Sequence, residues 1–302
     1  LTVNGTLIPG TASQVISGTG TLTGTGYAHV NRTAATADFS SQYTISNKTL
    51  TDLTVEYAVA GGGQVVSAIT YGGLKLDNTS GTNTLAGAVT VGRTLTTTAG
   101  GTLDIGVNAL TVNDLVNAGS IVVNSTALNV NGSMIVSGNA TQTGTVTYNR
   151  LMHTKAEWGD YHFFASPVTS NTEENAAKVT TIWGWDEVTG TWPVVAYNSL
   201  TSGRGYNLEQ TSGSDGLITF TGQIVAADVT IDATSPYSDI VTGAEPNYDS
   251  REWADGSGHS GTARSLSAYG GGGWNLLGNP YTSAINAEEF IAYGRNDDNL
   301  DP

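Results

Sequence analysis

The phrase Ala109-Leu-Thr-Val-Asn113 recurs further along the chain as Ala127-Leu-Asn-Val-Asn131. A weaker copy, Ala88-Val-Thr-Val-Gly92, lies upstream of the first, and Leu1-Thr-Val-Asn-Gly5 has the same form. Short alternating segments, separated by Gly and Asn, run between the copies. Recurrence of a short apolar phrase at a nearly fixed spacing is typical of a protein built from stacked repeats.

These phrases predict a β-solenoid, or β-helix, over residues 1–150. Each coil would return the chain to the same side, with Leu, Val and Ile pointing inward and with Gly and Asn at the corners. We therefore expect Val112 and Val130 to point inward, one above the other. A β-sandwich with strands spaced by about 8–12 residues is the alternative fold.

Composition favours an all-β chain and excludes several classes of function. Charged residues make up 12% of the sequence, which is poor for surface helices, and the absence of Cys excludes a disulfide framework. The formal net charge of −15 would repel a phosphate backbone, so we expect no nucleic-acid partner. No apolar run reaches the roughly 20 residues that span a bilayer.

The two halves of the chain differ in charge. Residues 1–150 carry six acidic and five basic residues and no Trp, whereas residues 151–302 carry 20 acidic residues, six basic residues and all six Trp. This shift predicts a domain boundary near Arg150. The second domain, residues 151–302, is expected to be β-sandwich-like, and its duplicated unit would be cut short at Pro302.

Longer and more varied strands are expected in the second half, together with one helix. Asn at a cap position, followed by Glu288 and Glu289 in the first turn, predicts a helix over 286–293. A surface loop is expected over 242–261. The expected strands are His162–Ala165, Thr181–Trp185, Gly205–Leu208, Leu217–Gly222 and Trp274–Leu277.

The second half also contains a duplicated strand–proline unit. The segment from Tyr161 to Ser170 matches the segment from Trp274 to Ser283 position by position in residue type. Each has an aromatic residue, a strand-like run, Ser or Asn, Pro and then Thr-Ser. Because Pro ends a strand ladder, we expect Pro167 and Pro280 to end equivalent strands. Phe164 and Leu277 would then occupy equivalent core positions in two related sheets.

Several of these motifs occur in an order that resembles large Bacteroidota surface proteins. They are Phe164-Ala-Ser-Pro-Val168, Ile182-Trp-Gly-Trp-Asp186, Gly203-Arg-Gly-Tyr206 and Gly273-Trp-Asn-Leu-Leu-Gly-Asn-Pro-Tyr281. Proteins of this class are exported by type IX secretion and often carry adhesin-like or gliding-motility repeats. The first half resembles the β-solenoid stalks of adhesins. The resemblance implies a bacterial cell-surface or secreted setting, so we expect an extracellular protein at the cell surface.

Tryptophans are the candidate ligand-binding residues of the second half. Trp183 and Trp185 alternate, so both would point to one face of a strand, and Trp192 follows after a turn. Exposed on the surface, the three rings would stack on sugars; buried, they would be part of a hydrophobic core. The sequence leaves both interpretations open.

Calcium is the one cofactor that the sequence suggests. Asp297, Asp298 and Asp301 offer hard oxygen ligands near the end of the chain, and Asp215, Asp249 and Asp255 stand in glycine-rich loops. No EF-hand spacing is present. His153 and His162, without any Cys, make a transition-metal site improbable on chemical grounds.

No catalytic motif is recognisable, and the chain is expected not to be an enzyme. Ser260 lacks the second Gly of a nucleophile elbow. The carboxylate pairs Glu173-Glu174, Asp186-Glu187 and Glu288-Glu289 are sequence neighbours, whereas glycosidases need carboxyls that face each other across a sugar. A polysaccharide lyase would need clustered basic residues, which the first half lacks.

The sequence therefore predicts a non-catalytic segment of a bacterial surface adhesin or filament. Its partners would be surface glycans, other surface proteins or further copies of itself. The alternative is a carbohydrate-binding accessory region of a secreted polysaccharide-degrading enzyme. The chain opens at Leu1 in a strand-like pattern, which is typical of a mature or excised segment.

Overall fold

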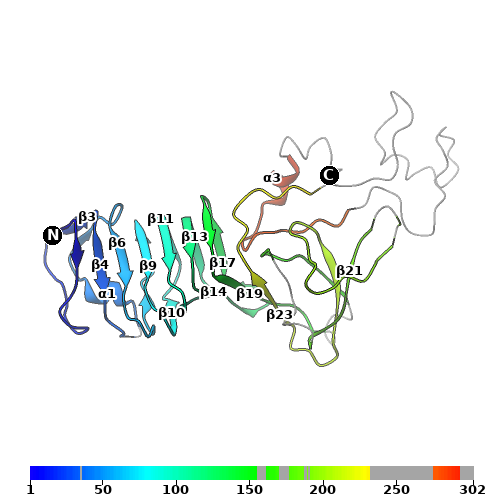
Figure 1. Cartoon of the computed structure of the whole chain (residues 1–302), viewed down its shortest axis with the longest axis horizontal. Coiled ribbons are helices and arrows are strands. Elements are labelled where there is room, and N and C mark those ends of the chain that lie inside the picture. Colours follow the sequence, from blue (N-terminus) through cyan, green and yellow to red (C-terminus); the bar gives the residue numbers. More distant parts are fainter. Residues whose placement is uncertain are drawn as a thin grey trace, which may run out of the picture.

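The computed structural model describes residues 1–34, 36–154, 161–169, 177–186, 189, 191–231 and 275–292. Strand accounts for 46% of the structure and helix for 4%, and the first half winds into a β-solenoid of about seven turns. The all-β prediction and the predicted solenoid are thus confirmed. Figure 1 shows the coils stacked along the long axis, with the second half at the far end from the N-terminus.

Three parallel faces make up the solenoid. Face 1 contains β1 (Thr2–Val3), β3 (Thr21–Gly24), β5 (Asn47–Lys48), β8 (Thr70–Tyr71), the first parts of β11 (Val89–Thr97) and β13 (Ala109–Asn117), and β17 (Ser133–Val136). Face 2 contains β2 (Thr6–Leu7), β4 (Tyr27–Val30), β6 (Thr54–Tyr57), β9 (Gly73–Leu76), the second parts of β11 and β13, and β18 (Ala140–Gln142). Face 3 contains β7 (Val65–Val66), β10 (Thr82–Leu85), β12 (Thr102–Gly106), β14 (Ser120–Val123) and β19 (Thr145–Leu151).

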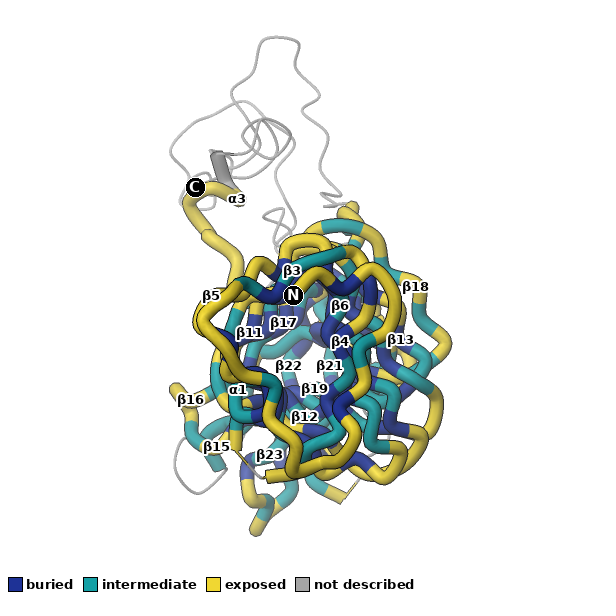
Figure 2. Tube along the Cα trace, turned by 90° about the vertical axis from the view of Figure 1, so that its left-hand side faces the viewer, coloured by how far each residue is buried: buried dark blue, intermediate teal, exposed yellow. Residues whose placement is uncertain are grey.

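The core of the solenoid is built by alternation along these strands. Leu103 and Ile105 of β12 are buried, as are Ile121 and Val123 of β14, with the residues between them facing outward. Leu103 lies in register with Ile121, so like residues stack from coil to coil. Figure 2, viewed along the coils, shows buried and more exposed positions following one another around the stack.

The stacking of the repeated phrases is partly as predicted. Val91 of the weaker upstream copy pairs with Val112, and both are buried. The prediction for Val130 is wrong, because its side chain is 40% exposed. Val112 is followed in the stack by Val136 instead.

The reason is an insertion between face 3 and face 1. Val130 lies in β16 (Val130–Asn131), which forms an antiparallel hairpin with β15 (Ser125–Ala127). The coil that leads from Leu110 to Met134 is therefore longer than the preceding one, which leads from Val89 to Leu110. The copy Ala127–Asn131, which matches Ala109–Asn113 best, thus extends into the inserted hairpin. Its recurrence in the sequence does not mark a coil of face 1.

A short helix, α1 (Asp38–Gln42), interrupts the early coils and contacts β4 and β7. The Asp38 carboxylate is fully buried and accepts hydrogen bonds from the backbone N–H groups of Ala34 at 2.7 Å and Val65 at 2.6 Å. Asp38 thus links the segment just before the helix to β7, the first strand of face 3.

The second half continues from the last coil. β23 (Leu217–Gly222) pairs antiparallel with β19 from Val146 to Leu151 and extends face 3 by one strand. A separate antiparallel sheet has the order β20 (Tyr161–Phe164), β22 (Tyr206–Gln210), β21 (Val179–Gly184). The predicted helix is confirmed as α3 (Ala287–Ala292), capped by Asn286, whose side-chain oxygen accepts from the N–H groups of Glu288 and Glu289.

The duplicated units are not found in two related sheets. Among the described residues Phe164 ends β20, whereas Leu277 takes part in an isolated bridge with Arg204 and in no strand; both side chains are half-buried. The two copies instead meet, because a Cβ placed on Gly278 would lie 2.2 Å from the Cβ of Ala165, its equivalent. Trp274 and the expected loop over 242–261 lie outside the described residues.

Candidate functional site

Exposed aromatic rings cover one face of the β20–β22–β21 sheet. Tyr161 and Phe163 alternate with His162 and Phe164 along β20, and their side chains are 62% and 68% exposed. Large aromatic side chains usually bury most of their surface, so two neighbours left this open on one strand are unusual.

The three predicted tryptophans lie on the same face. Trp183 pairs across the sheet with Asn207, which pairs in turn with Phe163, so the side chains of all three project to one side. Trp183 and Trp185 are half-buried, and Trp192 is 40% exposed. Together Tyr161, Phe163, Trp183, Trp185 and Trp192 are called the aromatic face.

Ring contacts hold the aromatic face together. Tyr161 meets Trp183 edge-on at a centroid distance of 5.7 Å. Trp192 lies 5.2 Å from Trp185 and 6.3 Å from Phe163. These distances are within the range in which aromatic pairs attract one another, so the rings are positioned by each other as well as by the sheet.

A short β-connection brings Trp192 to the face. Asp186 and Thr191 form an isolated bridge, and Trp183 forms another with Val194. The Thr189 hydroxyl donates to the Asp186 carboxylate at 2.8 Å, which fixes the turn between them. Asp186 therefore supports the turn structurally.

The opposite side of this sheet is the hydrophobic core of the second half. Ile182, Tyr206 and Leu208 are buried there, and the Phe164 ring lies 5.9 Å from Phe220 of β23. His162 also belongs to this side, and burial, followed by the charge of His153, lowers the pKa of His162. The sheet thus has one packed face and one aromatic face open to solvent.

Tyr161 and Phe163 were not predicted as site residues. The signal was present in the sequence, since both alternate with the inward His162 and Phe164. Their strand was interpreted only as part of the duplicated strand–proline unit. Which of the two faces packs against β23 depends on contacts with residues distant in the sequence, and the local pattern does not contain them.

The predicted calcium ligands Asp297, Asp298 and Asp301 lie outside the described residues, as do Asp249 and Asp255. Asp215 is described, and its carboxylate forms an ion pair with Lys178 at 3.0 Å. Among the residues that the structure describes, no group of three or more His, Cys, Asp or Glu side chains is arranged to hold a metal ion. Ser260, Glu173, Glu174 and Glu187 fall in the remaining segments.

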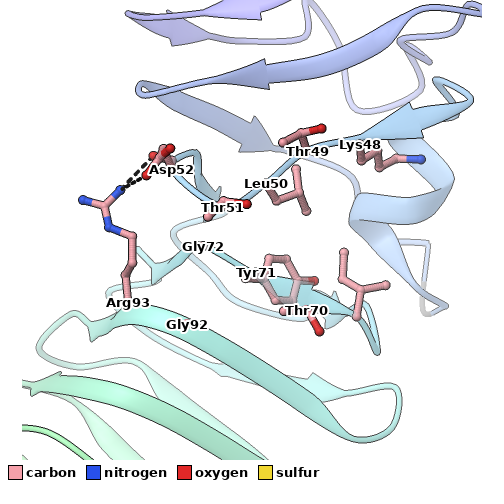
Figure 3. A pocket seen from close by; sticks show the side chains of 11 residues that line it. Lys48, Thr49, Leu50, Thr51, Asp52, Thr70, Tyr71, Gly72, Gly92 and Arg93 are labelled. Atoms are coloured by element: carbon pink, nitrogen blue, oxygen red, sulfur yellow. Dashed lines mark hydrogen bonds and ion pairs between the residues drawn. The ribbon is translucent and has the colours of Figure 1, made fainter.

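A hollow lies on face 1, where the parallel ladder is interrupted between β5 and β8. It has a volume of about 670 Å³ and is floored by Leu50, Ile69 and Tyr71. Figure 3 shows Lys48 at one end and Arg93 at the other. Arg93 donates to the backbone oxygen of Asp52 at 2.9 Å, and Lys48 to that of Ile45 at 2.9 Å. Both cations are thus engaged within the protein.

The fold and the site define a β-solenoid protein that ends in an antiparallel sheet with an aromatic surface. Over residues 74–302 the chain matches the family described as a domain of unknown function (DUF8693), and it belongs to that family. The match runs from β9 through the last coils and into the second half, so both parts lie within one family unit. No curated protein and no solved structure matches the chain.

Proposed function

We propose that this chain is a non-catalytic display-and-binding segment of a bacterial surface protein, with the solenoid as a stalk and the aromatic face as the contact surface. The single observation that carries the proposal is the solvent-open aromatic face at the end of the solenoid opposite the N-terminus (Figure 1). Exposed apolar patches of this kind mark binding surfaces on soluble proteins.

The solenoid suits a stalk because each coil contacts only its neighbours, so length can increase without a change in the core. Where described, no helix is long and apolar enough to cross a membrane. An extracellular, cell-surface location and a Bacteroidota adhesin setting remain part of the proposal, supported by the resemblance of the strand–proline and Trp motifs.

Surface binding tests this proposal directly. Fluorescently labelled full chain would be incubated with intact bacterial cells and with immobilised polysaccharides, beside the double variant Tyr161→Ala/Phe163→Ala. We expect the double variant to lose most of the bound signal. Tyr27→Ala serves as the matched control, because Tyr27 is 43% exposed on β4 of the stalk. Equal binding by all three proteins would contradict the proposal.

The alternative is a carbohydrate-binding accessory region of a secreted polysaccharide-degrading enzyme. It would use the same aromatic face, so the binding test does not separate the two. The full-length gene product does, because only the alternative requires a catalytic domain in the same protein. Polysaccharide cleavage by the present chain, abolished by a single carboxylate substitution, would contradict both.

The carboxylate pair Glu288-Glu289 has a structural explanation on α3. Glu288 and Glu289 are both exposed on α3, and the N–H groups of both bind the capping side chain of Asn286. Acidic side chains in a first helical turn stabilise the helix through its dipole. This structural role supports the non-catalytic interpretation of that pair.

A further inference from the structure

We infer that the ligand of the aromatic face is a neutral polysaccharide chain and that Asn207 beneath the rings contributes to its selection. This inference rests on the proposed function and adds the chemical class of the ligand. It depends on three observations: the exposed rings, the polar side chains between them and the sign of the charges around them.

The aromatic face alternates between apolar and polar strips. β20 and β21 at the two sides supply the rings, and the central strand β22 supplies Asn207 and Glu209 on the same side, as the strand register requires. A sugar ring has a C–H face that stacks on aromatic rings and a rim of hydroxyls that needs hydrogen-bonding partners. A partner protein with a uniformly apolar surface would offer no hydrogen-bond donor to Asn207 in the central strip.

Charge on this surface disfavours acidic ligands. The aromatic face and the β22 residues between its rings include Glu209 and no Lys or Arg, and residues 151–302 carry 20 acidic and six basic residues. A uronate or sulfated polymer would meet like charge there. A neutral chain would not, and the hydroxyls of Thr189 and Thr191, 2.7 Å apart on the turn beside Trp192, add further polar groups at the edge.

Asn207 supplies an independent sign of ligand binding. Its side-chain oxygen is buried and has no hydrogen-bond partner among the residues that the structure describes, and Asn207 lies in register between Phe163 and Trp183. A buried acceptor left without a donor destabilises the fold, and such groups concentrate at functional sites. Phe163 is 68% exposed, and its ring contact with Trp192, at 6.3 Å, is the longest of the three on the aromatic face, so a shift of this ring would let a sugar hydroxyl donate to Asn207.

Affinity electrophoresis of the full chain tests the inference. Native gels would contain neutral polymers (arabinoxylan, mannan or a mixed-linkage glucan) or the acidic polymer polygalacturonate. We expect at least one neutral polymer to retard the protein and polygalacturonate not to do so. In Phe163→Ala the apparent dissociation constant should rise about tenfold, as expected for the loss of one stacking contact. Tyr27→Ala should migrate like the wild type.

The variant Asn207→Leu separates a ligand group from a structural one. It removes an unsatisfied buried acceptor, so the urea midpoint should stay the same or rise, while affinity for the retarding polymer should fall. An unchanged affinity in this variant would overturn the role of Asn207. The ligand class would be overturned if polygalacturonate retarded the protein as strongly as any neutral polymer does. It would also be overturned if none of the polymers retarded the protein.

Failure of this inference is distinguishable from failure of the proposed function. Suppose that no neutral polymer binds, yet the chain binds cells or associates with itself in a manner that Phe163→Ala abolishes. The contact surface then stands, and only its ligand class is wrong. If Phe163→Ala changes no binding of any kind, both the ligand class and the contact surface are refuted.

Discussion

Thr282 and Met134 lie far apart in the sequence and hydrogen-bond to each other twice. The Thr282 hydroxyl donates to the Met134 carbonyl at 2.7 Å, and the Met134 N–H donates to the Thr282 carbonyl at 3.2 Å. Thr282 is 1% exposed. The segment that follows Pro280 thus covers β17, the last strand of face 1.

The other two faces of the last coil are covered as well. Gln142 of β18 exchanges hydrogen bonds of 3.0 Å with the backbone N–H and carbonyl of Ile224. β23 covers β19 on face 3. An uncovered strand edge is a template for pairing with other chains, so the second half protects the end of the solenoid from aggregation.

Loss of the Thr282 hydroxyl should therefore weaken the junction. Thr282→Val removes the donor to a buried carbonyl while keeping the side-chain volume, and we expect a loss of about 1–3 kcal/mol in the free energy of unfolding. Urea denaturation measures it. Thr49→Val is the matched control, because Thr49 is exposed, and it should change stability little. If the two substitutions lowered the free energy of unfolding equally, the Thr282 hydroxyl would not stabilise the covering of β17.

Val112 and Val130 should respond differently to the same substitution. Val112 is fully buried between Val91 and Val136, so Val112→Asp should cost at least about 3 kcal/mol of stability or prevent folding. Val130 is 40% exposed on the inserted hairpin, and Val130→Asp should be nearly neutral. Thermal unfolding of both variants checks this. A large destabilisation by Val130→Asp would place that side chain in the core.

The two valines also show what sequence periodicity can establish. Leu-x-Val alternation indicates a strand with one apolar side, and that was sufficient to predict the solenoid. It does not distinguish a strand of the coil from a strand of an inserted hairpin, because both have the same local pattern. The distinction lies in the partner: Val112 finds Val91 and Val136, whereas Val130 pairs with Ala127 in a hairpin.

Elements with strong local signals were predicted well. The strand from Leu217 to Gly222 has the predicted bounds, and the helix capped by Asn286 differs by one residue at each end. The cap around Thr282 and the orientation of Phe163 were missed, because both depend on contacts between residues far apart in the sequence. A single sequence contains no direct record of such contacts.

A glycine column at a corner of the coils should not tolerate a side chain. A Cβ on Gly144 would lie 1.9 Å from the carbonyl oxygen of Gly119 in the preceding coil. Gly144→Ala would force the two coils apart, with an expected cost of about 1–3 kcal/mol. A Cβ on Gly20 would meet nothing within 4 Å, so Gly20→Ala is the control. Urea midpoints that shift equally in both variants would contradict this stacking.

The last prediction concerns acid pH and a charged ladder on face 2. Lys75 donates to the Glu56 carboxylate at 2.6 Å and forms an ion pair with Asp77 at 3.3 Å. Burial alone would raise the pKa of Asp77, but hydrogen bonds from Thr98 and Lys75 outweigh burial, and the pKa lies below its ordinary value.

A carboxyl whose pKa is lower in the folded than in the unfolded protein favours folding when it is ionised. Its contribution is complete above the unfolded pKa of about 3.9 and is lost as the pH falls through the folded pKa. The wild type should therefore lose more stability between pH 6 and pH 3 than Asp77→Asn, which has no such proton to bind. Urea midpoints at the two pH values measure the difference, and carboxyls remote from Lys75, such as Asp215, affect both proteins alike. Thr98→Val removes the hydroxyl that donates to Asp77 at 2.9 Å, so its loss of stability should lie between those of the wild type and Asp77→Asn. If the wild type and Asp77→Asn lose stability equally, the hydrogen bonds to Asp77 do not stabilise its ionised form.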